Sequence, residues 1–279
     1  MKISAWLTCV LALASLAQSP TTTAASRFTG LEGNPNLRSA SALVIDADGD
    51  LIYGKDIDTV RPIASITKLM TAMVVLDSGV DLGEKITVSK ADRDTVQLTG
   101  SRLGYGAALS RREMILLAIM SSENRAAAAL GRNFPGGLPA FVEQMNAKAE
   151  SLGMSQSHFA DPAGLRVENQ STARDLGRMV SAALDYPLIR EASTTQRLEV
   201  YPWKNRGPLN YVNTNRLLKN ESWDIALSKT GYINEAGRCL VMQANIEGEP
   251  VSIVLLNSFG KLTPFGDSNR LRKWMLAGR

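Results

Sequence analysis

Apolar residues recur at helical spacing directly after Ser65. They follow one another within a short stretch, as Ile66, Leu69, Met70, Met73, Val74 and Leu76. This spacing is typical of a buried helix, which we predict to open at Ser65 and to run to Leu76. Lys68 then lies one turn beyond Ser65, on the same face of the helix.

Further helices are indicated by caps and by apolar periodicity. Ser110 and Glu113 form a capping box, which predicts a helix from there to Met120. Thr172 is a second N-terminal cap, ahead of apolar residues that end near Leu184. Three more helices are expected over residues 126–130, 139–152 and 269–276.

Runs of apolar and β-branched residues predict strands near both ends of the chain. Residues 42–46 and 51–53 flank the pair Asp48-Gly49, which favours a β-hairpin. A short strand is expected over 85–88, and a meander over 223–228, 238–246 and 251–257. The last part of the chain is therefore expected to be mainly β.

Aromatic residues gather in the segment 194–218, which is expected to form a hairpin or a lid. Tyr201, Trp203 and Tyr211 could line a substrate groove, or they could pack beneath a long loop. A loop of this length favours packing as the interpretation.

The first 25 residues have the pattern of a signal peptide. Lys2 gives a positive start, residues 6–16 form an apolar core, and small residues that follow offer a cleavage site. The apolar run is too short for a stable membrane span. We therefore expect export with cleavage. Cys239 then remains alone, so no intramolecular disulfide can form, and its apolar neighbours predict a buried thiol.

Composition and charge narrow the function classes further. The 279 residues are 44% hydrophobic and 21% charged, which is ordinary for a globular protein. The net charge of +4 comes from scattered basic residues, so no nucleic-acid surface is expected. One histidine in the whole chain makes a histidine-rich metal site unexpected, and no cofactor is predicted. His158 has no evident carboxylate partner, which favours a structural or surface role.

Three short motifs carry the candidate chemistry, namely Ser65-x-x-Lys68, Ser122-Glu123-Asn124 and Lys229-Thr230-Gly231. The first alone would be a chance match. Together and in this order they form the set known from penicillin-binding proteins and class A β-lactamases. The second motif also falls between two predicted buried helices, where polar side chains are costly unless they are satisfied or used.

The residue types in the first two motifs suit acyl transfer without histidine. At a helix start, Ser65 lies near free backbone N–H groups that can hold an oxyanion. Lys68 can take its proton if burial keeps the amine partly neutral. Ser122 could relay a proton to a leaving amine, and Asn124 could hold both the lysine and a substrate amide.

The third motif suits the binding of an anionic, extended substrate. Lys229 would add a positive field and Thr230 a hydroxyl for a carboxylate. Gly231 would let substrate and backbone approach closely, and the edge of a strand there could pair with a peptide.

Whole stretches of the chain, beyond these motifs, resemble one protein family. It is the serine-type D-alanyl-D-alanine peptidase family of low-molecular-mass penicillin-binding proteins, and within it the small D-alanyl-D-alanine endopeptidases. The stretches that carry the resemblance are residues 61–76, 120–127, 171–176, 229–231 and 236–240.

The resemblance implies an α+β fold of the β-lactamase/transpeptidase type. A five-stranded antiparallel sheet would be flanked by helices, in a single peptidase domain over residues 26–279. An α-helical subdomain would be inserted at roughly 85–190.

The resemblance also implies a mechanism and a substrate. Ser65 would be acylated with Lys68 as its base, and backbone N–H groups of Ser65 and Tyr232 would form the oxyanion hole. Ser122, Asn124 and Lys229 would complete the site. Cross-linked peptidoglycan peptides would be cut at the bond from D-alanine to a diamino acid, and β-lactam antibiotics would acylate the serine as mimics.

The region after the third motif bears on localisation. Larger relatives continue into a second β-rich domain and a membrane-binding tail, whereas only 48 residues follow Gly231 here. A periplasmic protein without a stable membrane anchor is therefore expected.

Three alternatives to an endopeptidase stay open. A D,D-carboxypeptidase would carry the same motifs, because they do not distinguish a terminal D-alanine from a cross-link. A β-lactamase would need a glutamate-positioned water, and the candidate pair Glu143 and Asn146 has a different spacing from the usual one. A non-catalytic peptidoglycan-binding protein would not need both Ser65 and Lys68.

Overall fold

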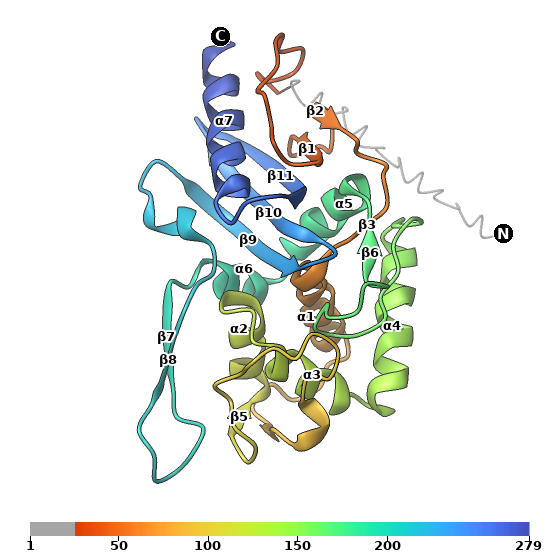
Figure 1. Ribbon diagram of the computed structural model, residues 1–279, viewed down its shortest axis with the longest axis vertical. Helices are drawn as coiled ribbons and strands as arrows, with labels where there is room; N and C mark the ends of the chain where they lie inside the picture. Colours follow the sequence, from red (N-terminus) through yellow and green to blue (C-terminus); the bar gives the residue numbers. More distant parts are fainter. Residues whose placement is uncertain (1–25, 279) are drawn as a thin grey trace, which may run out of the picture.

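The computed structural model describes residues 26–278, which form a five-stranded antiparallel sheet with helices on both faces (Figure 1). The predicted signal peptide, residues 1–25, lies outside the described residues. The strand order is β2-β1-β11-β10-β9, so β9 is an edge strand. The strands are β1 (Ser41–Ile45), β2 (Leu51–Lys55), β9 (Asp224–Ile233), β10 (Gly237–Ile246) and β11 (Glu249–Ser258). The α+β fold with its five-stranded sheet is confirmed.

Alternation along the strands divides the apolar core into two layers. In β1, Leu43 belongs to one buried cluster and Val44 to the other, because successive side chains leave a strand on opposite faces. Helix α7 (Thr263–Ala277) covers the face of Val44 and packs on β10 and β11. The other face packs against the helices that lie between β2 and β9 in sequence.

Six α-helices lie in that intervening part of the chain, mostly below the sheet in the view of Figure 1. They are α1 (Thr67–Asp77), α2 (Arg111–Met120), α3 (Asn124–Arg132), α4 (Gly137–Ser151), α5 (Ala173–Ala183) and α6 (Pro187–Thr194). The capping boundaries predicted at Ser110 and Thr172 are both confirmed, since each side chain accepts a bond from the N–H three residues on. The division into a domain and an inserted subdomain stays a prediction.

Three two-stranded ladders and three 3₁₀ turns connect these elements. The ladders pair β3 (Arg61–Pro62) with β6 (Gln170–Ser171), β4 (Lys85–Thr87) with β5 (Ala108–Ser110), and β7 (Arg197–Val200) with β8 (Leu209–Val212). The 3₁₀ turns are η1 (Ala64–Ile66), η2 (Lys90–Asp92) and η3 (Arg216–Lys219). Among the described residues, no helix is both long and apolar enough to span a membrane.

The aromatic segment forms the hairpin β7–β8, which runs down one side of the helices (Figure 1). Tyr211 is buried beneath the guanidinium of Arg102, 3.9 Å from its ring centroid. Trp203 packs on Gly104, and Tyr201 is exposed. The predicted hairpin is confirmed, and two of its three aromatic rings pack against the loop at 102–104.

Several predicted boundaries were wrong, each for a local reason. The last helix begins at Thr263, not at 269, because Pro264 fits the first turn of a helix, where its missing N–H costs nothing. Pro187 starts helix α6 in the same way, and that helix was not predicted. Strand β9 continues through the third motif to Ile233.

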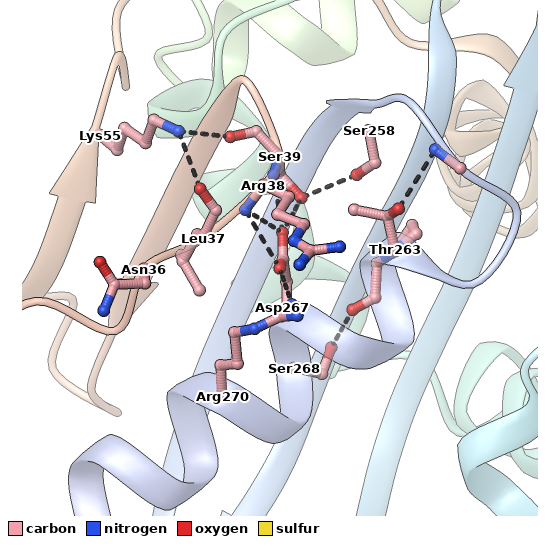
Figure 2. Close-up of polar contacts among 12 residues, drawn as sticks. Asn36, Leu37, Arg38, Ser39, Lys55, Ser258, Thr263, Asp267, Ser268 and Arg270 are labelled. Atoms are coloured by element: carbon pink, nitrogen blue, oxygen red, sulfur yellow. Dashed lines mark hydrogen bonds and ion pairs between the residues drawn. The ribbon is translucent and has the colours of Figure 1, made fainter.

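A buried carboxylate ties the start of the described chain to the last helix. Asp267 accepts hydrogen bonds from the backbone N–H groups of Arg38 and Ser39, at 3.0 and 2.7 Å, and from Ser39 Oγ at 2.6 Å. Arg270 adds an ion pair at 2.6 Å, and Figure 2 shows these groups around the carboxylate. Ser39 Oγ also contacts Ser258 Oγ at 2.7 Å, which joins β11 to the same network.

Removing this carboxylate should destabilise the whole sheet. Asp267→Ala leaves two backbone N–H groups and a buried hydroxyl without their acceptor, so we expect a loss of about 2–4 kcal/mol in the free energy of unfolding. Denaturant melts monitored by circular dichroism measure it. Arg270→Ala is the matched control and should cost below about 1 kcal/mol, because its side chain is partly exposed. Equal effects of the two variants would contradict the assignment.

Candidate active site

Ser65 lies on the 3₁₀ turn η1, directly before α1, and this turn contacts strands β9 and β10. The sequence prediction that it opens an α-helix is therefore corrected by two residues, since α1 begins at Thr67. Ala64, just before it, has a positive φ of 48°. A backbone conformation this rare for a non-glycine residue persists only where its surroundings impose it.

Lys68 is buried beneath the serine and donates three hydrogen bonds. Its Nζ lies 2.7 Å from Ser65 Oγ, 2.8 Å from Asn124 Oδ1 and 2.6 Å from the backbone oxygen of Ala163. Burial lowers the pKa of Lys68 from 10.5 to about 7, although the charges of Asp161, Glu123 and Asp94 oppose this change. A substantial fraction of the amine is therefore neutral at physiological pH.

The second motif follows the end of α2. Ser122 has a positive φ of 58°, and Asn124 is the first residue of α3, with Glu123 as its cap. The Asn124 amide donates to Thr99 Oγ1 at 2.8 Å, while that hydroxyl donates to Asp94. This chain of donors fixes the amide so that its oxygen faces Lys68.

The third motif lies on the edge strand β9. Lys229 is buried, and its Nζ donates to Ser122 Oγ at 3.0 Å. Burial and the nearby charge of Lys68 lower the pKa of Lys229 well below its usual value. An anion entering the site would raise the pKa of Lys229 again, because an opposite charge favours the charged amine. Thr230 Oγ1 donates to Thr214 Oγ1 at 2.7 Å.

These groups surround one cavity of about 390 Å³. Its lining includes the predicted residues Ser65, Ser122, Asn124, Thr230, Gly231 and Tyr232. Lys68 and Lys229 lie beneath it and bond to its two serines. The structure therefore brings all eight predicted site residues together. Their catalytic roles stay predictions.

Other residues of the cavity lie outside the motifs and escaped the sequence analysis. Arg216 of η3, Arg238 of β10 and Lys261 of the turn before α7 line it, and no acidic side chain of the described residues does. The guanidinium of Arg238 stacks 3.5 Å from the ring centroid of Tyr232. Arginines and lysines are common on surfaces, so only the fold could select these three. The Ala163 oxygen could not be predicted from the sequence either, because a backbone carbonyl leaves no signal in residue type.

Three residues that could have offered other chemistry do not line the active-site cavity. His158 is exposed and joins Gln170 through its backbone. Glu143 and Asn146 do not line the cavity, and the Asn146 amide instead bonds the backbone of Phe159. The buried thiol of Cys239 borders the cavity, but burial raises its pKa to about 11, as expected for an inert cysteine.

Gly231 provides a sharp test of the geometry around the serine. A Cβ at this position would lie 2.9 Å from the Ile63 oxygen and 3.2 Å from the Ser65 nitrogen, so Gly231→Ala must push β9 away from η1. We expect acylation of the serine to slow by about 10–100-fold, because small displacements of reacting groups are that costly. Rapid-quench acylation by a labelled penicillin measures the rate. Gly207→Ala, where a Cβ meets nothing within 4 Å, should leave it unchanged.

A buried lysine bonded to a serine hydroxyl, beside a Ser-x-Asn turn and a Lys-Thr-Gly strand, defines the class of protein. These features are typical of serine peptidases of the penicillin-binding type, whose first motif places a lysine one helical turn after the serine.

Comparison with known proteins gives the family. Residues 29–260 match the model of the peptidase S11 family, described as D-alanyl-D-alanine carboxypeptidase. The chain belongs to this family. It is 49% identical to a D-alanyl-D-alanine endopeptidase of Pseudomonas aeruginosa, over 90% of this chain and 81% of that protein. It is 47% identical to the Escherichia coli D-alanyl-D-alanine endopeptidase, over 88% and 79% respectively.

Solved structures agree with the fold. The crystal structure of the Streptomyces K15 DD-transpeptidase is similar with a TM-score of 0.82 and 28% identity, and the match covers 88% of this chain and 100% of that one. More distant curated relatives include a D-alanyl-D-alanine carboxypeptidase of Bacillus subtilis, at 32% identity over 80% of this chain.

Proposed function

We propose that this protein is a D-alanyl-D-alanine endopeptidase, which hydrolyses D-alanyl cross-links in peptidoglycan through an acyl-enzyme on Ser65. Its identity of nearly one half to two curated endopeptidases, over most of both chains, supports this substrate. The bond between Lys68 Nζ and Ser65 Oγ is the observation that carries the mechanism.

The neighbours of Lys68 favour its role as the base. A neutral amine has two N–H bonds and one lone pair. Its partners Asn124 Oδ1 and the Ala163 carbonyl can only accept, so they take the two N–H bonds. The lone pair is left for the Ser65 hydroxyl, which is the only one of the three partners able to donate. This arrangement suits proton abstraction from the serine.

The reaction has two stages, which are acylation of the serine and hydrolysis of the acyl-enzyme. The Ser65 oxygen attacks the D-alanyl carbonyl carbon and its proton passes to Lys68. The carbon–nitrogen bond then breaks, and the leaving amine takes a proton, with Ser122 as a relay from the buried lysines. Water then attacks the ester, the bond to Ser65 breaks, and the serine regains its proton as the new D-alanine carboxyl group is released.

The edge of β9 would hold the substrate beside the serine. An extended peptide can pair with this free edge, and Thr230 would bind a carboxylate of the substrate. Backbone N–H groups of Ser65 and Tyr232 would stabilise the oxyanion. β-Lactam antibiotics would occupy the same place and acylate the serine. We further propose that the signal-peptide pattern of residues 1–25 directs the enzyme to the periplasm.

The second candidate is a D,D-carboxypeptidase, which removes a terminal D-alanine. The description of the family and the names of several relatives favour it. The two activities differ only in the leaving group on the amine side of the scissile bond, so the cavity geometry serves both.

A competition between the two substrates distinguishes these activities. The mature protein is incubated with an equimolar mixture of a cross-linked dimeric muropeptide and a monomeric pentapeptide muropeptide, and products are separated by liquid chromatography with mass detection. An endopeptidase converts the dimer into two monomers and leaves the pentapeptide largely intact. Release of free D-alanine with the dimer untouched would establish the carboxypeptidase instead.

A further inference from the structure

Residues 161–166 form a loop that lies along the first turns of α1. Two consecutive carbonyl groups of this loop accept hydrogen bonds from side chains one turn apart on the helix. The Pro162 oxygen accepts from Thr71 Oγ1 at 2.7 Å, and the Ala163 oxygen accepts from Lys68 Nζ at 2.6 Å. Neighbouring loop carbonyls are therefore held by neighbouring turns of α1.

The next residue of the loop touches the backbone that precedes the serine. Gly164 has a positive φ of 74°, and a Cβ built on it would lie 2.0 Å from the Ala64 oxygen. Contact this close is open only to glycine. The loop thus contacts α1 at two levels, Thr71 and Lys68, and then contacts η1 at the strained residue Ala64 beside the nucleophile.

One side chain gives the loop its shape. The carboxylate of Asp161 accepts hydrogen bonds from four successive backbone N–H groups and from one side-chain amide. The donors are Ala163 and Gly164 at 2.7 Å, Leu165 at 3.1 Å, Arg166 at 2.8 Å and Asn169 Nδ2 at 2.6 Å. With its N–H groups turned inward to Asp161, the loop turns the carbonyls of residues 162 and 163 outward, to the helix.

Core packing covers only part of this loop, namely Pro162, Ala163 and Gly164, which are buried. Five of its six residues border a second cavity of about 340 Å³, which Lys68 does not line. Hydrogen bonds within the loop therefore add rigidity on the side that packing leaves open.

From these contacts we infer that Asp161 is a positioning residue for acylation, because its carboxylate folds the loop that sets the Ala163 carbonyl on the Lys68 amine. The inference rests on the proposed role of Lys68 as base. The Ala163 carbonyl takes one of the two N–H bonds of the neutral amine, and it thereby directs the lone pair to Ser65. Loss of the Asp161 carboxylate frees four loop amides and lets that carbonyl move away.

If Asp161 is a positioning residue, its replacement should slow acylation without weakening the binding of the acylating agent. Asp161→Asn keeps the size of the side chain but replaces one of its two acceptor oxygens by an NH2 group, so at least two of the five donors lose their acceptor. With a labelled penicillin, we expect the first-order acylation constant to fall by about 10–100-fold, the cost of a displacement of about 1 Å. The dissociation constant of the initial complex should stay within about threefold, because Asp161 does not line the active-site cavity. Stopped-flow acylation over a range of penicillin concentrations gives both constants.

Two variants keep this test informative. Asp46 also braces a turn by accepting from backbone N–H groups, those of Asp48 and Asp50, but it lies in the β1–β2 hairpin. Asp46→Asn should therefore leave the acylation constant unchanged. Thr71→Val removes the neighbouring bond to Pro162 without any change of charge, and should slow acylation by about 3–10-fold.

The outcomes separate the inference from the proposed function. Acylation of Asp161→Asn within twofold of the wild-type rate would overturn the inference. A loss that is fully explained by a smaller fraction of folded molecules would overturn it as well. If Asp161→Asn does not fold, a wild-type rate in Thr71→Val overturns it. If the wild-type protein itself forms no penicillin adduct, the proposed function fails, whatever the variants do.

Discussion

Replacement of Ser65 by alanine is expected to abolish cleavage of a cross-linked muropeptide dimer, with a loss of at least about 10⁴-fold in kcat. In the proposed mechanism the serine oxygen forms the acyl bond, and no second hydroxyl of the described cavity residues bonds to the Lys68 amine. Substrate binding should persist, since the edge of β9 and Thr230 are untouched. Chromatographic quantification of the monomers released over time measures the loss.

Two controls accompany this measurement: the melting temperature of Ser65→Ala and the activity of a matched serine variant. Ser65→Ala should melt close to the wild-type temperature, because the change removes one hydroxyl at a site that is 9% exposed. Ser222→Ala, at an exposed serine, should retain full activity. Dimer cleavage by Ser65→Ala above about 1% of the wild-type rate would remove this serine as the nucleophile.

Lys68 should govern the pH dependence of acylation. Its pKa is lowered to about 7 by burial, and only the neutral amine can accept the serine proton. The neutral fraction grows as the pH rises through the pKa, so the acylation constant should rise with pH, with a midpoint near 7. The rate at pH 5 should accordingly be a small fraction of the rate at pH 8. Stopped-flow acylation across this pH range records the midpoint.

Lys68→Arg should lose this pH dependence together with most of the rate. A guanidinium stays charged at every pH of the experiment, so it cannot serve as the base, and we expect acylation to slow by about 10²–10⁴-fold. Lys148→Arg is the matched control, because that lysine is paired with Asp77 at the surface. An acid limb near pH 7 that survives in Lys68→Arg would assign the titration to another group.

The sequence predicts most of the fold where a local signal exists. Ser110 with Glu113, and Thr172, mark helix starts because a short polar side chain can satisfy free N–H groups there. It misleads where proline starts a helix, as Pro187 and Pro264 do, because proline is equally common in loops. The strand through Lys229 to Ile233 was underestimated, since its polar motif interrupts the apolar pattern.

For the active site, the motif residues could be predicted from the sequence, whereas their surroundings could not. Ser65, Lys68 and Asn124 could be selected from the sequence because three short motifs occur in a fixed order. Their environment could not, because the Ala163 carbonyl carries no signal of residue type, and Asp161 becomes informative only once its loop lies on α1. The low pKa of Lys68 likewise depends on burial by segments far apart in the chain.

The most direct test of the proposed mechanism is the mass of the mature protein during incubation with a labelled penicillin, followed by peptide mapping of the adduct. We expect one penicillin per molecule, attached to the peptide that contains Ser65, and an adduct that persists for many minutes. An adduct that forms and clears within seconds would identify a β-lactamase. No adduct at all, from a folded protein, would contradict the acyl-enzyme on Ser65.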